Sequence, residues 1–183
     1  MTLANRITLF RLGLIPVFAV CLMSYTREQY WIRYVALGVY FTAAISDCLD
    51  GFIARAYNQK TKLGAVLDPL ADKLLINIAF VFLAVNENFV TRVPYWYPVV
   101  ILSRDVFIVL GAYLINEYFG PLRVRPRITG KITTFCQSAS VIAVLVEVEF
   151  AYPLLMVTLI MTVISFFDYL YAGAKQASDE DEA

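Results

Sequence analysis

The sequence predicts an all-α, polytopic membrane protein with six transmembrane helices. Of its 183 residues, 60% are hydrophobic and 16% are charged, whereas soluble domains have roughly half apolar and a quarter charged residues. The apolar residues fall into six stretches, each close to the roughly 20 residues that a membrane-spanning helix needs. The formal net charge is zero, so nucleic acid is not an expected partner.

The predicted spans cover residues 7–25, 31–52, 64–86, 95–116, 129–148 and 151–172. The first stretch is not expected to be a cleaved signal peptide, because Arg11 interrupts it and no small-residue cleavage site follows. No repeat or flexible linker divides the chain. We therefore expect one domain over residues 1–183, ending in a short disordered acidic tail at about 176–183.

The positive charges predict how the spans are oriented. If the spans alternate in direction, one side of the membrane receives most of the lysines and arginines, namely Arg6, Arg55, Lys60, Lys62, Arg123, Arg125, Arg127, Lys131 and Lys175. Cytoplasmic loops are enriched in these residues, so both termini are expected to face the cytoplasm. The membrane itself is expected to be a bacterial inner membrane or the equivalent membrane of an organelle. The aromatic residues Tyr30, Trp31, Tyr34, Tyr95, Trp96 and Tyr97 are expected at the opposite interface.

Several kinds of chemistry are excluded by composition. Cys21, Cys48 and Cys136 form no CxxC pair and lie in apolar runs, which argues against a disulfide framework or a zinc site. The chain contains no histidine, so it lacks Ser-His and Cys-His nucleophile pairs and HExxH zinc sites. Acid–base chemistry would have to use carboxylate, lysine, tyrosine or water.

The segment from Ile45 to Leu75 carries four aspartates in an otherwise apolar region: Asp47, Asp50, Asp68 and Asp72. Helical residues three or four apart share a face, so each pair lines one face at the cytoplasmic end of its span. Four unpaired carboxylates in a membrane would cost on the order of 10 kcal/mol. Cationic partners are therefore required among them.

Arg55 and Lys73 alone do not neutralise four clustered acids. Carboxylates without histidine or cysteine suit hard ions, so we expect two divalent cations, Mg²⁺ or Mn²⁺. A pair of such ions is typical of sites for phosphoryl chemistry. Gly51, Ala54 and Gly64 stand close to the aspartates in sequence, which leaves room for a bulky ligand near the backbone.

The spacing Asp47-x2-Asp50-Gly51-x2-Ala54-Arg55-x8-Gly64-x3-Asp68-x3-Asp72 resembles the signature of the CDP-alcohol phosphatidyltransferase family at every defined position. The resemblance implies an enzyme that transfers the phosphatidyl group of CDP-diacylglycerol to an alcohol and releases CMP. It also implies that the chain forms a homodimer and that membrane lipids surround it.

The resemblance further implies roles for individual residues. The two divalent cations would be held by Asp47, Asp50 and Asp68, with Asp72 as the general base and a further candidate metal ligand. The CDP-lipid would be bound by Gly51, Ala54, Arg55 and Gly64. Asn5 and Thr8 are further candidates for nucleotide binding, although a helix cap and a snorkelling Arg11 would explain this segment equally well.

Arg104, Lys131 and Arg127 form the candidate site for an acceptor phosphate, because all three lie on the predicted cytoplasmic side and Arg104 lies within a span. Two alternatives remain: Arg104 could pair with its neighbour Asp105, and the other cations could serve topology alone. A cationic pocket favours glycerol 3-phosphate or phosphatidylglycerol over serine or inositol.

The acceptor itself is left with two candidates. Asn5-x2-Thr8-x2-Arg11 and the segment GKITTFCQ are similar to bacterial phosphatidylglycerophosphate synthases, which favours glycerol 3-phosphate. The segment SRDV, residues 103–106, is similar to cardiolipin synthases, for which phosphatidylglycerol is the acceptor. A function of another class, a cation-coupled small membrane transporter, would also place acids in spans.

Overall fold

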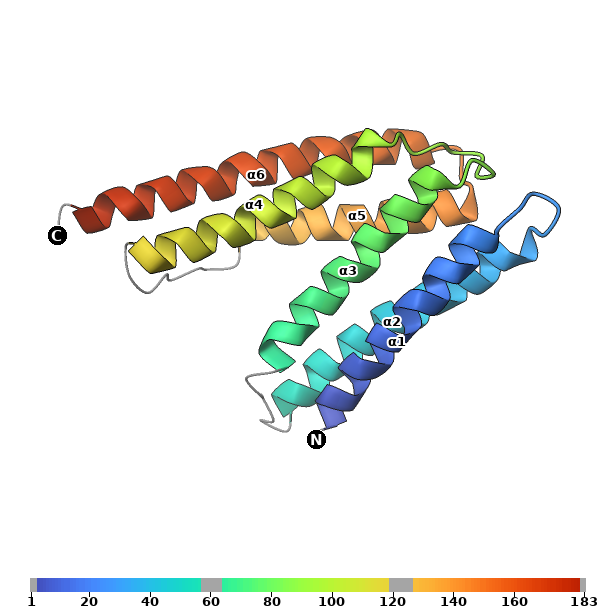
Figure 1. Ribbon diagram of the computed structural model, residues 1–183, viewed down its shortest axis with the longest axis horizontal. Helices are drawn as coiled ribbons and strands as arrows, with labels where there is room; N and C mark the ends of the chain where they lie inside the picture. Colours follow the sequence, from blue (N-terminus) through green and yellow to red (C-terminus); the bar gives the residue numbers. More distant parts are fainter. Residues whose placement is uncertain (1–2, 57–63, 119–126, 182–183) are drawn as a thin grey trace.

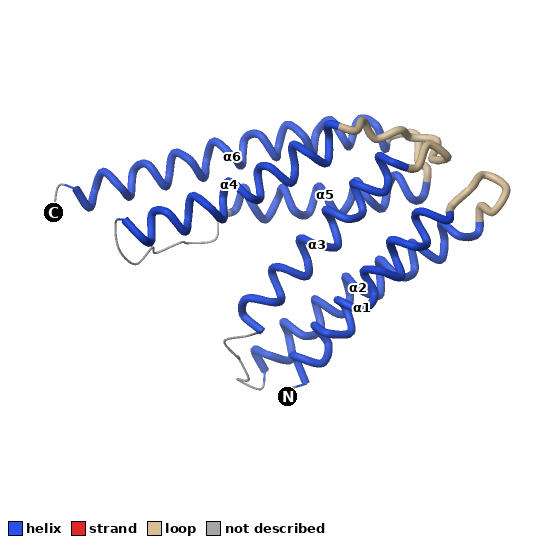
Figure 2. Tube along the Cα trace, viewed as in Figure 1, coloured by secondary structure: helices blue, strands red, loops and turns tan. Residues whose placement is uncertain are grey.

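The computed structural model describes residues 3–56, 64–118 and 127–181 (Figure 1). The side chains of residues 3–8, 47–56, 64–70, 115–116, 118 and 175–181 lie outside that description. Every regular element in the described part is a helix (Figure 2). The helices are α1 Leu3–Ser24, α2 Trp31–Ala56, α3 Gly64–Val85, α4 Trp96–Tyr118, α5 Ile128–Val146 and α6 Ala151–Asp181.

The six helices confirm the predicted all-α class, and their ends show where apolar pattern and helix differ. α1 starts at Leu3 and α2 continues to Ala56, four residues beyond each predicted span. The largest difference is α6, whose 31 residues extend to Asp181 and into the acidic tail that was expected to be disordered. No glycine or proline follows Gly173 in this segment, so nothing in the sequence stops the helix.

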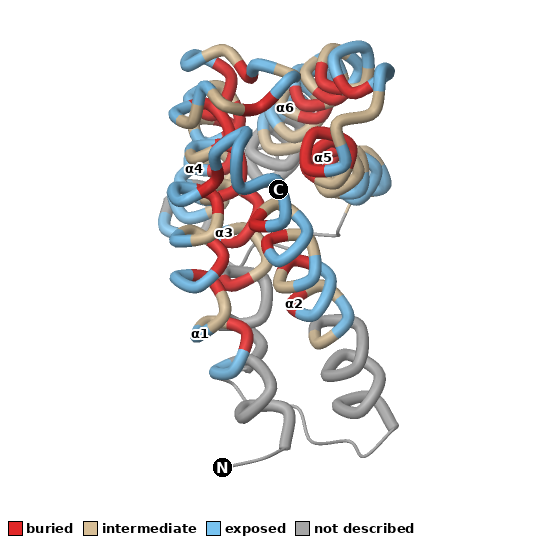
Figure 3. The backbone as a smooth tube through the Cα atoms, turned by 90° about the vertical axis from the view of Figure 1, so that its right-hand side faces the viewer, coloured by how far each residue is buried: buried red, intermediate tan, exposed pale blue. Residues whose placement is uncertain are grey.

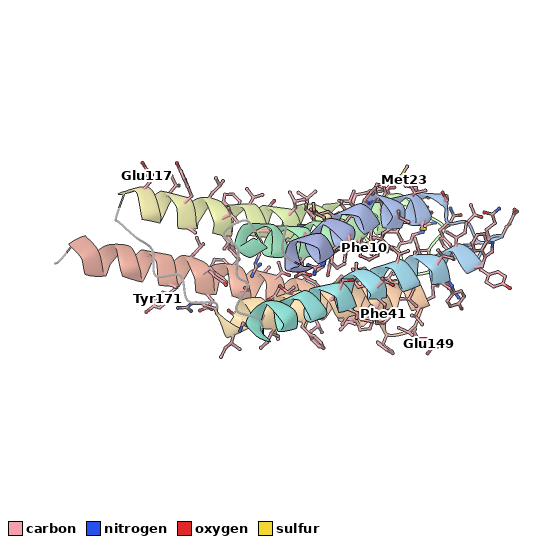
Figure 4. The ribbon with its side chains drawn as sticks, turned by 90° about the horizontal axis from the view of Figure 1, so that it is seen from below. Phe10, Met23, Phe41, Glu117, Glu149 and Tyr171 are labelled. Carbon is pink, nitrogen blue, oxygen red and sulfur yellow. The ribbon has the colours of Figure 1, made fainter. Side chains whose placement is uncertain are left out.

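Among the residues that the structure describes, three helices are long and apolar enough to cross a membrane: they contain the stretches Trp96–Leu114, Ile128–Val146 and Ala151–Ala174. Shorter apolar helical stretches, Leu9–Ser24 and Trp31–Ser46, occur in the described part of α1 and α2. Large apolar side chains are exposed on the outer faces, among them Phe10, Met23 and Phe41 (Figure 4). This pattern is that of an integral membrane protein, whose outer surface contacts lipid.

The helices pack into two groups that meet at α3. α1 packs against α2 and α3, while α6 packs against both α4 and α5. α3 joins the groups through contacts with α4 and α5, and α2 also contacts α5. The buried faces of the helices point toward one another (Figure 3). Within the described residues α4 and α5 make no contact with each other, and α3 and α6 each contact both of them.

The three described loops gather at the end of the molecule opposite the aspartate segment (Figure 2). There Glu147 forms an ion pair with Arg33 and accepts a hydrogen bond from Tyr25 Oη at 2.9 Å. Asn86 donates to the carbonyls of Leu22 and Tyr25 at 2.7 and 2.9 Å. These contacts tie the α1–α2 hairpin to α3 and to the α5–α6 turn.

The aromatic residues predicted at this interface separate into two kinds. Tyr30, Trp31, Tyr34, Tyr95 and Trp96 are exposed, as residues facing the membrane interface would be. Tyr97 is fully buried and donates from Oη to the Leu155 carbonyl at 2.9 Å. The interfacial prediction was therefore wrong for Tyr97, because its hydroxyl finds a partner inside the bundle.

Buried hydroxyl groups join α5 to α6. Ser140 and Thr158 share a hydrogen bond of 2.7 Å, and Thr158 also donates to the Cys136 carbonyl at 3.1 Å. One turn closer to the aspartate end, Thr133 donates to the Met161 carbonyl at 3.1 Å. Between membrane helices such bonds replace the hydrophobic driving force, so they fix α5 against α6 next to the site described below.

Candidate functional site

A cavity of about 630 Å³ lies between α3, α4 and α5 in the half of the bundle that carries the aspartates. Its lining comes from five helices and combines small, apolar and charged side chains. The lining residues are Ala44, Asp72, Lys73, Ile76, Arg104, Ile108, Val109, Arg127, Gly130, Lys131, Thr134, Phe135, Ser138 and Tyr169.

The cavity brings together one carboxylate and four cations that are far apart in sequence. Asp72 and Lys73 come from α3, Arg104 from α4, and Lys131 from the first turn of α5, which Arg127 immediately precedes. The predicted acceptor residues Arg104, Arg127 and Lys131 therefore line one cavity, and the candidate base Asp72 lines it too. Such an arrangement suits an anion held beside a proton acceptor.

Arg104 is 6% exposed and is held on three sides. Its Nη1 donates to Asp105 Oδ1 at 2.7 Å, its Nη2 donates to Ser165 of α6, and its guanidinium lies 5.7 Å from the ring centre of Tyr169. The expected ion pair with Asp105 is thus present, and Arg104 lines the cavity as well. Its buried Nε has no hydrogen-bond partner in the described part of the chain.

Asp105 also reaches across to α3. The same oxygen, Oδ1, accepts a hydrogen bond from Lys73 Nζ. The Asp105 side chain is 12% exposed and is absent from the cavity lining, so it holds both wall cations from behind. Lys73 therefore pairs with α4, away from its sequence neighbour Asp72.

The other wall carries one paired arginine and one lysine. Arg127 forms an ion pair with Asp168 of α6, and Thr129 Oγ1 donates to the second oxygen of Asp168 at 2.6 Å. Lys131 is exposed and has no ion pair with any described residue. It is thus the cation of this wall whose charge stays uncompensated within the described residues.

Gly130 lies where α5 approaches the tyrosine that covers Arg104. A Cβ atom added at Gly130 would stand 2.9 Å from Tyr169 Oη and 3.2 Å from Cε2 of the same ring. Only glycine therefore admits the ring without a shift at this point.

The remaining predicted residues are placed by backbone only. Residues 47, 50, 51, 54 and 55 lie in the last turns of α2, and residues 64 and 68 lie at the start of α3. The side chains of Asp47, Asp50, Gly51, Ala54, Arg55, Gly64 and Asp68 lie outside the described residues, as do those of Asn5 and Thr8. Among the side chains that are described, no three potential metal ligands form a group.

Arg11 departs from its expected environment, because it is fully buried instead of reaching toward the membrane surface. This burial excludes the snorkelling interpretation of Arg11. The expectation that Asn5 and Thr8 bind nucleotide stays a prediction.

Sequence reasoning missed the residues that hold the cations in place: Ser165, Asp168 and Tyr169 of α6, and Asp105 in its link to Lys73. Asp168 carried a usable signal, since an ionisable residue inside an apolar span indicates function by default. Ser165 and Tyr169 carried none, because small hydroxyl and aromatic residues are ordinary in membrane helices.

Comparison with known proteins identifies the family of the chain. The model of the CDP-alcohol phosphatidyltransferase family matches residues 1–164. A human protein named cardiolipin synthase (CMP-forming) is 34% identical over 95% of this chain, and this chain spans 62% of that protein's length. Two relatives are named CDP-diacylglycerol–glycerol-3-phosphate 3-phosphatidyltransferase. The Bacillus subtilis protein is 34% identical over 91% of this chain and 92% of its own length. The Escherichia coli protein is 31% identical over 95% and 96%.

The spacing of the aspartates, the helical membrane fold and the match over residues 1–164 agree, and the chain belongs to the CDP-alcohol phosphatidyltransferase family.

Proposed function

We propose that this chain transfers the phosphatidyl group of CDP-diacylglycerol to glycerol 3-phosphate, giving phosphatidylglycerophosphate and CMP. The observation that carries the proposal is the cavity in which Lys73, Arg104 and Lys131 surround the space next to Asp72. Two relatives that carry this activity in their names match the chain along nearly its whole length.

The cavity is suited to a phosphate-bearing alcohol. Hydrogen bonds between a cation and a phosphate are among the stronger polar contacts, worth roughly 1.5–3 kcal/mol each. Lys131 has an uncompensated charge within the described residues, and the buried Nε of Arg104 still lacks a partner there. Inositol would leave these donors without an anion, and serine would offer only a singly charged carboxylate beside its own ammonium group.

Asp72 is proposed as the general base. Its carboxylate would take the proton of the acceptor hydroxyl, whose oxygen then attacks the phosphorus that bears the diacylglycerol. A new oxygen–phosphorus bond forms, the bond to the CMP oxygen breaks, and CMP leaves with those electrons. The cations of the cavity would hold the acceptor phosphate so that its hydroxyl lies beside Asp72.

The four aspartates are proposed to hold two divalent cations. α2 and α3 pack against each other, and positions 47, 50, 68 and 72 fall on their adjoining ends (Figure 1). The donors are all carboxylates in a chain without histidine, a set that fits Mg²⁺ or Mn²⁺. When bound, such ions supply charge stabilisation at the donor diphosphate. Gly51, Ala54, Arg55 and Gly64 are proposed to line the CDP pocket beside them.

The proposal includes six membrane spans, with both termini and the cavity on the cytoplasmic side, in one domain. The support is the concentration of lysine and arginine at that end of the helices. A homodimer, implied by the family resemblance, remains a prediction.

Phosphatidylglycerol is the second candidate acceptor, which would make the chain a cardiolipin synthase. The apolar side of the cavity favours it, because Val109 and Phe135 are 61% and 75% exposed and form a margin toward the lipid-facing surface. The human cardiolipin synthase also matches nearly the whole of this chain. The transporter alternative has no such support.

An acceptor panel tests the proposal. Protein purified in detergent is incubated with CDP-diacylglycerol, Mg²⁺ and one acceptor: glycerol 3-phosphate, phosphatidylglycerol, serine or inositol. We expect CMP release and phosphatidylglycerophosphate by mass spectrometry with the first acceptor, and neither with a chelator or in Asp72→Asn. Cardiolipin as the only product would establish the second candidate, and no product with any acceptor would refute the proposed reaction.

A further inference from the structure

One carboxylate oxygen connects two walls of the cavity. Asp105 Oδ1 accepts hydrogen bonds from Arg104 of its own helix and from Lys73 of α3. Both cations line the cavity, whereas Asp105 stands behind them. The position of each cation is therefore coupled to the other through a residue that an acceptor would not touch.

The hydrogen bonds of Asp105 matter because the groups that make them are largely buried. Asp105 and Arg104 have side-chain exposures of 12% and 6%, and buried charges are stable only when paired. Two cations that share one oxygen would repel each other without it. Loss of the carboxylate would therefore let Lys73, on its flexible stem, leave the position next to Asp72, and would remove one of the bonds that orient Arg104.

A second ion pair shows what a purely structural link looks like in the same bundle. Glu147 pairs with Arg33 at the opposite end of the helices, where it also accepts from Tyr25. Neither Glu147 nor Arg33 lines the cavity. Both acids join different helices, yet only Asp105 acts on groups that face the space beside Asp72.

We infer that Asp105 is a positioning residue that holds Lys73 and Arg104 for the acceptor phosphate and so contributes to the preference for phosphate-bearing acceptors. The inference rests on the proposed function. Asp105 acts through the two cations, takes no proton in the reaction and makes no contact with the donor.

The test compares Asp105→Asn with the matched variant Glu147→Gln, each of which removes one interhelical carboxylate. In two-substrate kinetics, Asp105→Asn is expected to raise the KM for glycerol 3-phosphate roughly 10-fold, the scale of one weakened charge-assisted contact. The KM for CDP-diacylglycerol should stay within about 2-fold. Glu147→Gln should lower the melting temperature and leave both KM values unchanged.

A double-mutant cycle identifies the route of the effect. In a Lys73→Gln/Arg104→Gln background, Asp105→Asn should add less than about 2-fold to the acceptor KM, because the groups it positions are gone. If Asp105→Asn does not fold, Asp105→Glu serves in its place. It keeps the charge but displaces the carboxylate by one methylene, and it should raise the acceptor KM several-fold.

A binding readout separates this inference from the proposed reaction. Glycerol 3-phosphate should raise the melting temperature of the wild type and of Glu147→Gln, since a ligand stabilises the state it binds. The shift should be lost in Asp105→Asn or reduced in Asp105→Glu. Unchanged acceptor KM and thermal shift in the Asp105 variants, or no shift in the wild type, would overturn the inference. A wild type that shows the shift but releases no CMP with any acceptor would refute the reaction alone.

Discussion

Replacement of Lys131 by glutamine is the sharpest test of the cationic cavity. Lys131 lines the cavity and has no ion pair among the described residues, whereas Arg104 and Arg127 are each paired with a different aspartate. Its charge is therefore the most available to an acceptor phosphate. A charge-assisted hydrogen bond is worth roughly 1.5–3 kcal/mol, which corresponds to about 10- to 150-fold in binding. We expect Lys131→Gln to raise the acceptor KM within this range.

Two control variants sharpen the comparison. Arg127→Gln/Asp168→Asn removes both members of an ion pair, whose summed charge is zero before and after the change, so its effect on the acceptor KM should be smaller than that of Lys131→Gln. Arg92→Gln removes an exposed cation at the far end of α3 and α4 and should leave the kinetics unchanged.

The assay is initial-rate CMP release from purified protein at saturating CDP-diacylglycerol, over a range of glycerol 3-phosphate concentrations. Part of the loss in Lys131→Gln will fall on turnover if the phosphate also orients the attacking hydroxyl. If acceptor KM and kcat of Lys131→Gln both equal those of the wild type, Lys131 serves topology only, and the reasoning from uncompensated charge is refuted.

Three further predictions concern other parts of the site. Asp50→Asn or Asp68→Asn should lower activity by at least about 100-fold while membrane insertion stays normal, since each removes a charged metal ligand. Near-normal activity in these variants would refute the two-metal proposal. Asp72→Asn should lose turnover but retain CDP-diacylglycerol binding in a filter assay, because a base acts on the transition state; equal loss of both would place Asp72 among the metal ligands. Gly130→Ala should displace the Tyr169 ring and raise the acceptor KM several-fold, and Tyr169→Phe in that background should relieve part of the contact. An unaltered KM in Gly130→Ala would show that the ring moves without effect on Arg104.

The helices were predictable because the property that defines a membrane helix, a run of apolar residues of sufficient length, is visible in the sequence. Their ends were less so. The apolar stretch of a membrane helix ends at the edge of the lipid, whereas the helix itself ends where its backbone hydrogen bonds end. α6 accordingly continues past its apolar stretch to Asp181. The burial of Tyr97 was not predictable either, since no local sequence pattern reveals that the Leu155 carbonyl will lie within hydrogen-bond distance of its hydroxyl.

The cations of the site were predictable because charge in an apolar span is costly and therefore informative. Arg104, Arg127 and Lys131 were assigned to one anion site from the sequence, and they line one cavity. The residues behind them were not predictable, because their importance depends on which helices pack together. Asp105 looked like a local partner of Arg104, and only the packing of α3 against α4 reveals its bond to Lys73.

One turn of α6 holds cations that line the cavity. α4 and α5 each carry cations of the cavity, and within the described residues they do not contact each other, whereas α3 and α6 each contact both of them. Ser165, Asp168 and Tyr169 stand three and four positions apart, so they share one helical face, and that face contacts Arg104, Arg127 and the surface at Gly130. One turn of α6 therefore contacts residues on both sides of the cavity. This turn follows directly after the residues matched by the family model, 1–164. The aspartates proposed to act on the donor and the cations proposed to bind the acceptor all lie inside that match, whereas the turn of α6 that holds Arg104 and Arg127 lies beyond it.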